Sequence, residues 1–190
     1  RSGRPSLRPA RDDFFTGSEA MIRSGVGSPF DLDDDAAYRR WRDARLEMAA
    51  SSPDELLVEV RDPLRLSAAG RDALLARCAR TNMAVYASPP RTKADSAVPR
   101  RIGEQLGLTT LDVNYLADDD GITPLSVAES GTRAAFIPYT NRPIRWHTDG
   151  YYNPPERRIR AMILHCVQRA ESGGENRLLD HELAYIALRD

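Results

Sequence analysis

The stretch Trp146-His147-Thr148-Asp149-Gly150 places an imidazole and a carboxylate on alternate residues. If the segment is extended, side chains two residues apart project from the same face, so His147 and Asp149 can reach one metal ion while Thr148 points away. An imidazole and a carboxylate oxygen belong to the donor set of a divalent iron site with two histidines and one carboxylate. A His-x-Asp triplet also arises readily by chance in an aspartate-rich chain, so the surrounding sequence has to support this prediction.

The bulk composition is that of a folded protein without a dominant charge. The chain has 190 residues and a formal net charge of −1, so we expect no nucleic-acid partner. Because no apolar run is long enough for a bilayer span and no secretory signal opens the chain, we expect no membrane partner and a cytoplasmic protein. Cys78 and Cys166 lie far apart in the sequence, and buried free thiols are favoured over a disulfide.

The first half of the chain predicts an arm followed by a helical region. Residues 1–32 are rich in Arg, Gly, Ser and Pro, which predicts a disordered or extended arm. Residues 33–107 predict helices with short strands between them, and Ser67 is a suitable N-cap for the second helix. The elements expected are a helix over 33–50, a strand over 56–60, a helix after Ser67, a strand over 83–86 and a helix over 96–106.

Residues 108–190 predict a β-rich half. Apolar runs alternate here with turn signals made of Asp, Asn, Pro and Gly, and Asp180 is expected to cap a final helix. Helices followed by many short strands predict an α+β chain whose second half is a sandwich or barrel. The strands expected span 124–128, 134–138, 144–149, 159–167 and 177–179.

Several features follow His147 and Asp149 in a fixed order. They are the pair Pro154-Pro155, the run Ile163-Leu164-His165-Cys166-Val167, the turn Ala170-x-x-Gly173-Gly174 and the helix after Asp180. In this order they resemble the taurine dioxygenase (TauD/TfdA-like) family of Fe(II)/2-oxoglutarate-dependent dioxygenases, closely over about residues 136–190 and loosely before that. The resemblance implies a double-stranded β-helix, or jelly roll, with N-terminal helices, of which residues 33–190 would form the N-terminal part.

The same resemblance implies a reaction and a set of site residues. His147 and Asp149 would be two of three Fe(II) ligands, which leaves places on the ion for 2-oxoglutarate and O₂. The enzyme would hydroxylate a small organic substrate while 2-oxoglutarate is decarboxylated to succinate. In the family a Thr hydroxyl holds a 2-oxoglutarate carboxylate; Asn176 stands at that place here, and its amide can still donate a hydrogen bond. The third ligand and the arginine that pairs with 2-oxoglutarate are expected downstream of this chain.

Two other functions stay open beside the dioxygenase. The first is a non-catalytic jelly-roll binding or assembly module without a complete metal triad. The second is a cupin-like metal protein that uses His147, Asp149 and His165 without 2-oxoglutarate. His165 alternates with apolar residues, so a core histidine bonded to the backbone is favoured over a metal ligand. His181, at a helix start, is expected to be solvated.

The partners are also only partly defined by the sequence. An unfinished sheet would be completed by further polypeptide, by a homo-oligomer or by a second chain. Basic residues near the candidate metal site indicate either an anionic substrate or, more simply, a solvated rim. These residues are Arg142, Arg145, Arg157, Arg158 and Arg160.

Overall fold

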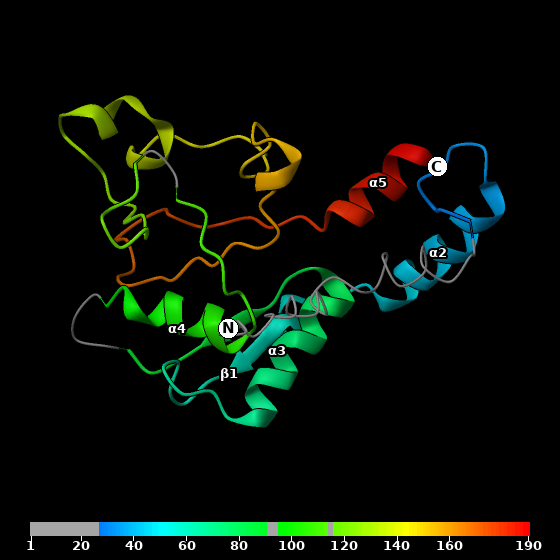
Figure 1. The fold of residues 1–190 in the computed structure, drawn as a ribbon, viewed down its shortest axis with the longest axis horizontal. Helices are drawn as coiled ribbons and strands as arrows, with labels where there is room; N and C mark the ends of the chain where they lie inside the picture. The colour runs from blue at the N-terminus through cyan, green and yellow to red at the C-terminus, as the bar shows by residue number, and fades with distance from the viewer. Residues whose placement is uncertain (1–26, 91–94, 114–115) are drawn as a thin grey trace, which may run out of the picture. The chain divides into compact units, whose positions relative to one another are not determined.

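A computed structural model describes residues 27–90, 95–113 and 116–190 of the chain (Figure 1). Its contacts divide the chain into two compact units, one made of residues 1–90 and 168–190 and the other of residues 91–167. Among the described residues, none of the helices is both long enough and apolar enough to cross a lipid bilayer.

Helix α2 (Asp35–Met48) begins where the sequence predicts a helix start. The Asp34 carboxylate accepts a hydrogen bond from the backbone N–H of Ala37 at 2.9 Å, which satisfies one of the free donors of the first turn. The acidic side chain of Asp35 also interacts favourably with the positive end of the helix dipole. The predicted helix is therefore confirmed, with ends slightly inside the predicted range.

Helix α5 (His181–Arg189) packs beside α2 within the first unit (Figure 1). Tyr38 and Trp41 of α2 form a buried core with Ile186 of α5, and Trp41 is only 2% exposed. The ring of Tyr185 stands edge-on to Trp41, with centroids 5.9 Å apart. Burial of these large side chains holds the two helices together, since each large apolar side chain contributes about 1.5–3 kcal/mol when removed from water.

The predicted arm lies mostly outside the described residues, which begin at position 27. The short segment before α2 packs on the same aromatic core. The ring of Phe30 lies 5.5 Å from that of Trp41 and 5.3 Å from that of Tyr185, measured between centroids. Arg189 adds a hydrogen bond of 2.8 Å to the Pro29 carbonyl.

Strands β1 (Leu57–Glu59) and β2 (Val85–Ala87) form a parallel pair joined by α3 (Ala68–Thr81). Leu57 pairs with Val85 in this register, and parallel strands need a crossover of the kind that α3 supplies. Ser67 caps α3, because its hydroxyl accepts a hydrogen bond from the Gly70 N–H at 3.1 Å. The predicted strands and the Ser67 cap are confirmed, whereas the parallel pairing was not expected from the sequence.

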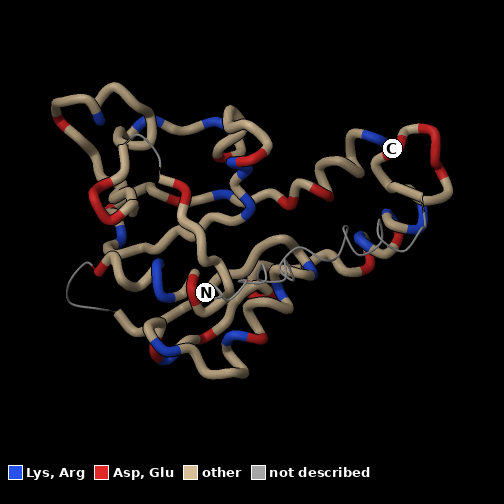
Figure 2. The backbone as a smooth tube through the Cα atoms, in the orientation of Figure 1, with Lys and Arg blue, Asp and Glu red and all other residues tan. Residues whose placement is uncertain are grey.

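A buried charge network joins α2, α5 and the end of α3. Arg45, 6% exposed, places Nη2 3.0 Å from an Asp180 oxygen and Nε 2.6 Å from a Glu182 oxygen. The Arg45 Nε–H makes no hydrogen bond of suitable angle, so the Glu182 contact is an ion pair only. Arg45 Nη1 also donates to the Arg80 carbonyl at 2.7 Å, and the Asn82 amide donates to both carboxylates at 2.9 and 3.0 Å. Elsewhere acidic and basic residues are mixed along the described chain (Figure 2).

A second ion pair sits at the surface of the first unit. Glu55, in the 3-10 helix Pro53–Leu56, accepts hydrogen bonds from Ser51 and pairs with Arg80 of α3. The Ser51 hydroxyl, followed by the Arg80 guanidinium, lowers the pKa of Glu55 from 4.5 to about 2. The ionised form of Glu55 is thus favoured by folding.

We expect Glu55→Gln to lower the midpoint of thermal unfolding at neutral pH. Because the folded-state pKa of Glu55 is depressed, its contribution is complete above the unfolded value of 4.5 and is lost as the pH falls toward about 2. The difference in midpoint between wild type and variant should therefore shrink as the pH is lowered through this range. Circular dichroism melting curves test this, with Asp54→Asn, an exposed neighbour, as the matched control. A difference that stays constant with pH would contradict the prediction.

In the second unit, α4 (Ala97–Gln105) supplies the buried residues Val98 and Ile102. The segment that carries Ile163 passes close to this helix, since a Cβ on Gly103 would lie 3.4 Å from the Ile163 Cδ1 atom. The position of α4 confirms the helix predicted over residues 96–106. Among the described residues of this unit, the other regular elements are the 3-10 helices Thr132–Ala135, Ile137–Tyr139 and Pro155–Arg157.

The strands expected between residues 108 and 190 are not formed in the described part of this region. Residues 124–128, 144–149, 159–167 and 177–179 contain neither helix nor strand, and 3-10 turns occupy 134–138. A strand requires a ladder of backbone hydrogen bonds to a neighbour, and an apolar pattern does not supply that neighbour. One link of this kind does occur, from Ala128 N–H to the Tyr139 carbonyl at 2.9 Å. The jelly roll that the resemblance implies is therefore not seen in the described residues.

Traces of the expected strand pattern remain along residues 159–167. Ile159, Ile163 and His165 are half-buried, and Met162 and Leu164 between them are exposed. Ala161 and Val167, which a strand would place on the same face as the half-buried residues, are exposed as well. The segment thus keeps only part of the side-chain pattern of a strand, without its hydrogen-bond ladder.

The cysteines are both free. Cys78 is half-buried in α3, where burial raises the pKa of its thiol. Cys166 is exposed, which corrects the expectation that it is buried. The physical reason is that residues 159–167 do not form the expected strand, so the segment is not paired into a sheet whose other layer would cover Cys166.

Candidate metal centre

His147 and Asp149 project toward each other from one segment of the second unit. The His147 Nε2 atom lies 3.9 Å from the Asp149 Oδ1 atom. Neighbouring ligands with bonds of about 2.1 Å stand about 3 Å apart on an octahedral ion, so a small rotation of either side chain would place both on one ion. The side chains are 43% and 50% exposed, which leaves space for further ligands.

The hydrogen bond of the His147 ring defines its tautomer. The Nδ1 atom lies 2.8 Å from the Arg145 carbonyl oxygen. Because a carbonyl can only accept, Nδ1 carries a hydrogen, so the neutral form of the ring has its free lone pair on Nε2, the nitrogen that lies 3.9 Å from Asp149 Oδ1. Histidines that bind metals commonly donate their second N–H to a carbonyl in this way. The pair of side chains therefore fits a divalent metal in both donor type and tautomer.

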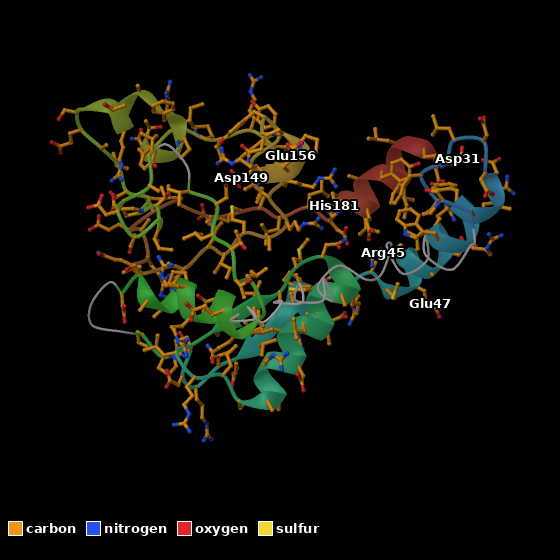
Figure 3. The ribbon with its side chains drawn as sticks, in the orientation of Figure 1. Asp31, Arg45, Glu47, Asp149, Glu156 and His181 are labelled. Atoms are coloured by element: carbon orange, nitrogen blue, oxygen red, sulfur yellow. The ribbon has the colours of Figure 1, made fainter. Side chains whose placement is uncertain are left out.

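The turn after Asp149 requires glycine. Gly150 has a φ of +68°, in the left-handed region, and a Cβ at this position would lie 2.2 Å from the Ile159 Cγ1 atom. The chain then folds through residues 151–158 and returns to Ile159. Asp149 and Glu156 mark two points near the start and the end of this loop (Figure 3).

His165 is not gathered with the two candidate ligands. It is half-buried. Over residues 27–90, 95–113 and 116–190, no three His, Cys, Asp or Glu side chains lie together in a way that could hold a metal ion. The described residues therefore do not assemble the cupin-like triad of His147, Asp149 and His165.

Asn176 and His181 belong to the other compact unit, and both are exposed. Asn176 lies in a segment without helix or strand. His181 is the first residue of α5 (Figure 3), and its exposure confirms that it is solvated. The role of Asn176 as a 2-oxoglutarate contact stays a prediction.

The basic residues near the site differ in their contacts. Arg157 is bound to Asp112, with Nη2 2.7 Å and Nε 3.1 Å from the same carboxylate oxygen. Arg142, Arg145 and Arg158 are exposed. Sequence reasoning missed the Asp112 contact, because the two partners are 45 residues apart and neither stands in a recognisable motif. Arg157 is therefore held by a carboxylate of this chain.

The comparisons with known proteins bear directly on this site. The family described as "Taurine catabolism dioxygenase TauD, TfdA family" matches residues 58–190, a span that includes His147 and Asp149. The chain belongs to this family. The match to TauD/TfdA begins at β1, so it extends well into the helical half that the sequence motifs covered only loosely. No curated protein and no solved structure gives a significant match.

Proposed function

We propose that this protein is an Fe(II)/2-oxoglutarate-dependent dioxygenase that hydroxylates a small organic substrate. Membership of the TauD/TfdA family is the observation that carries this proposal, because the matched span includes a His-x-Asp pair whose donor atoms converge. When bound, iron supplies the activation of O₂, coupled to the conversion of 2-oxoglutarate to succinate and CO₂. The protein as a whole would take 2-oxoglutarate, O₂ and a small molecule as its partners.

The chain's own residues have distinct tasks in this proposal. His147 and Asp149 would hold the iron, and the Arg145 carbonyl would keep the His147 ring in the tautomer that presents Nε2. Asn176 would donate a hydrogen bond from its amide to a 2-oxoglutarate carboxylate. Exposed arginines in the same unit as His147 would attract anions, so an anionic substrate is the substrate class that we would screen first.

The direct test is conversion of 2-oxoglutarate to succinate by the protein as its gene encodes it. We expect succinate to form when Fe(II), 2-oxoglutarate and O₂ are present together, and to be lost when any one of them is withheld. A panel of small carboxylates and sulfonates, added one at a time, should contain compounds that accelerate the conversion. Failure to form succinate under every condition would contradict the proposal.

The same experiment separates the second candidate function, a non-catalytic binding or assembly module of the same family. Such a module would form no succinate, yet it would still bind a small molecule or a partner chain. Thermal stabilisation of the protein by a compound that gives no turnover would favour the module, because any ligand selective for the folded state raises the unfolding midpoint.

A further inference from the structure

The loop that follows the candidate ligands is closed by contacts within itself. The Asn153 N–H donates to the Gly150 carbonyl at 2.9 Å, and the Asn153 side-chain amide donates to the Arg157 carbonyl at the same distance. The Arg157 N–H in turn bonds to the Pro154 carbonyl at 2.9 Å. These bonds give residues 150–157 a closed loop conformation that begins directly after Asp149.

One carboxylate from elsewhere in the chain ties this loop down. The Oδ1 atom of Asp112 accepts from both Nε and Nη2 of Arg157, at 3.1 and 2.7 Å. Its Oδ2 atom lies 3.4 Å from the Asn153 amide nitrogen, 41 residues away in the sequence. Asp112 thus contacts the loop at two points, and its bonds to Arg157 join oppositely charged groups, which makes them stronger than neutral hydrogen bonds.

The segment around Asp112 is itself packed against another turn. A Cβ on Gly121 would lie 2.8 Å from the Leu111 Cδ2 atom and 3.2 Å from the Val113 Cγ2 atom. Asp112 stands between these two residues, so the side chains on either side of it both lie against the Gly121 turn. Asp112 therefore contacts the loop from a segment outside the His-x-Asp segment.

We propose that Asp112 and Arg157 are positioning residues, which hold the loop 150–158 and thereby keep Asp149 where its carboxylate faces the His147 Nε2 atom. This inference rests on the proposed function, because it concerns the metal ligands. The connection is short: Asp149 is joined to Gly150, whose lack of a side chain lets the loop close on Ile159. Without the clamp, the loop would lose its hydrogen bonds to Asp112, and the Asp149 carboxylate would sample more orientations.

The expected effect on metal binding is moderate. Groups that hydrogen-bond a metal ligand directly contribute about 10–100-fold to metal affinity. Asp112 and Arg157 act on Asp149 only through the loop, and their ion pair is exposed, so they should contribute less. The Arg157 side chain is 56% exposed. We therefore expect Asp112→Asn and Arg157→Gln each to weaken metal affinity about three- to tenfold.

The test uses Mn(II) as an air-stable probe, with its binding to the complete protein followed by electron paramagnetic resonance. Asp112→Asn and Arg157→Gln should weaken binding, and the charge-swapped double variant Asp112→Arg with Arg157→Asp should recover most of the affinity. Arg158→Gln, an exposed neighbour, is the matched control. Hydrogen exchange of the amides of residues 150–153 and 156–158 in the metal-free protein should be faster in the two single variants than in wild type, with unchanged thermal midpoints.

Each outcome has a separate meaning. Single variants that bind Mn(II) as tightly as wild type would overturn the positioning role while leaving the proposed function intact. Unchanged hydrogen exchange in the loop would also overturn it, because the clamp would then not order the loop. A wild-type protein that binds no Mn(II) at all would overturn the proposed function, and this inference with it.

Discussion

Replacement of His147 by Ala, or of Asp149 by Ala, should reduce 2-oxoglutarate turnover by more than about a hundredfold. Residues that merely support a ligand contribute 10–100-fold, so removal of a ligand itself should cost at least the upper part of that range. Only His147 and Asp149 of this segment direct donor atoms toward a common point, with Nε2 and Oδ1 3.9 Å apart. Succinate formation and Fe(II) affinity, measured by competition with a chelator, should fall together.

Two other substitutions make this prediction specific. Thr148 lies between the two proposed ligands, and its side chain is expected to point away from them. Thr148→Ala should therefore change turnover by no more than about twofold. His165→Ala separates the cupin-like alternative, because that alternative requires His165 as a ligand. If His165→Ala removes bound metal while His147→Ala does not, the assignment of the ligands given above is wrong.

Replacement of Arg45 by Met should destabilise the first unit by about 3–5 kcal/mol, the range observed when one partner of a buried ion pair is removed. Without the Arg45 guanidinium, the carboxylates of Asp180 and Glu182 would remain buried without the positive charge that neutralises them, although the Asn82 amide would still donate to both. Asp180 is also the N-cap of α5, so the docking of this helix on α2 should weaken. Urea unfolding followed by the fluorescence of the buried Trp41, in a Trp146→Phe background, measures the change.

The control and the rescue separate lost charge pairing from lost packing. Arg39→Met on the same helix removes an exposed arginine, 3.9 Å from Asp35, and should shift the free energy of unfolding by less than about 0.5 kcal/mol. Adding Asp180→Asn and Glu182→Gln to Arg45→Met should restore most of the stability, because the buried charges are then gone. If Arg45→Met alone lowers the free energy of unfolding by less than about 1 kcal/mol, the buried charge network does not stabilise the first unit.

The helices of this chain are predictable from the sequence because their signals are local. Asp34, Ser67 and Asp180 each accept a hydrogen bond from a backbone N–H two or three residues further on. Such caps depend on neighbouring residues alone, so they can be read without knowledge of the fold. The helix positions follow from them to within a few residues.

The sheet could not be predicted in the same way. The parallel register of Leu57 with Val85 depends on how α3 returns the chain, and no local pattern specifies it. The expected strands over residues 124–179 require partners distant in sequence, and the described residues provide only isolated links such as that from Ala128 to Tyr139. Apolar alternation indicates an extended segment, but pairing decides whether that segment becomes a strand.

In the candidate site, too, local features can be predicted from the sequence and contacts between distant residues cannot. The convergence of His147 and Asp149 follows from their spacing, and the ring hydrogen bond to Arg145 is also local. The clamp of Asp112 on Arg157 joins residues 45 positions apart, so only the folded chain brings it into view. The family match adds the chemistry that neither spacing nor contacts supply.

The central claim, that His147 and Asp149 bind Fe(II) in a 2-oxoglutarate-dependent enzyme, is tested most directly by anaerobic titration. Fe(II) is added to the protein in the presence of 2-oxoglutarate, and the visible absorption spectrum is recorded at each step. We expect a weak charge-transfer band that saturates at one iron per chain in wild type and in Thr148→Ala, and that is missing in His147→Ala and Asp149→Ala. A wild-type protein that develops no band, or a band of equal strength in all four proteins, would contradict this claim.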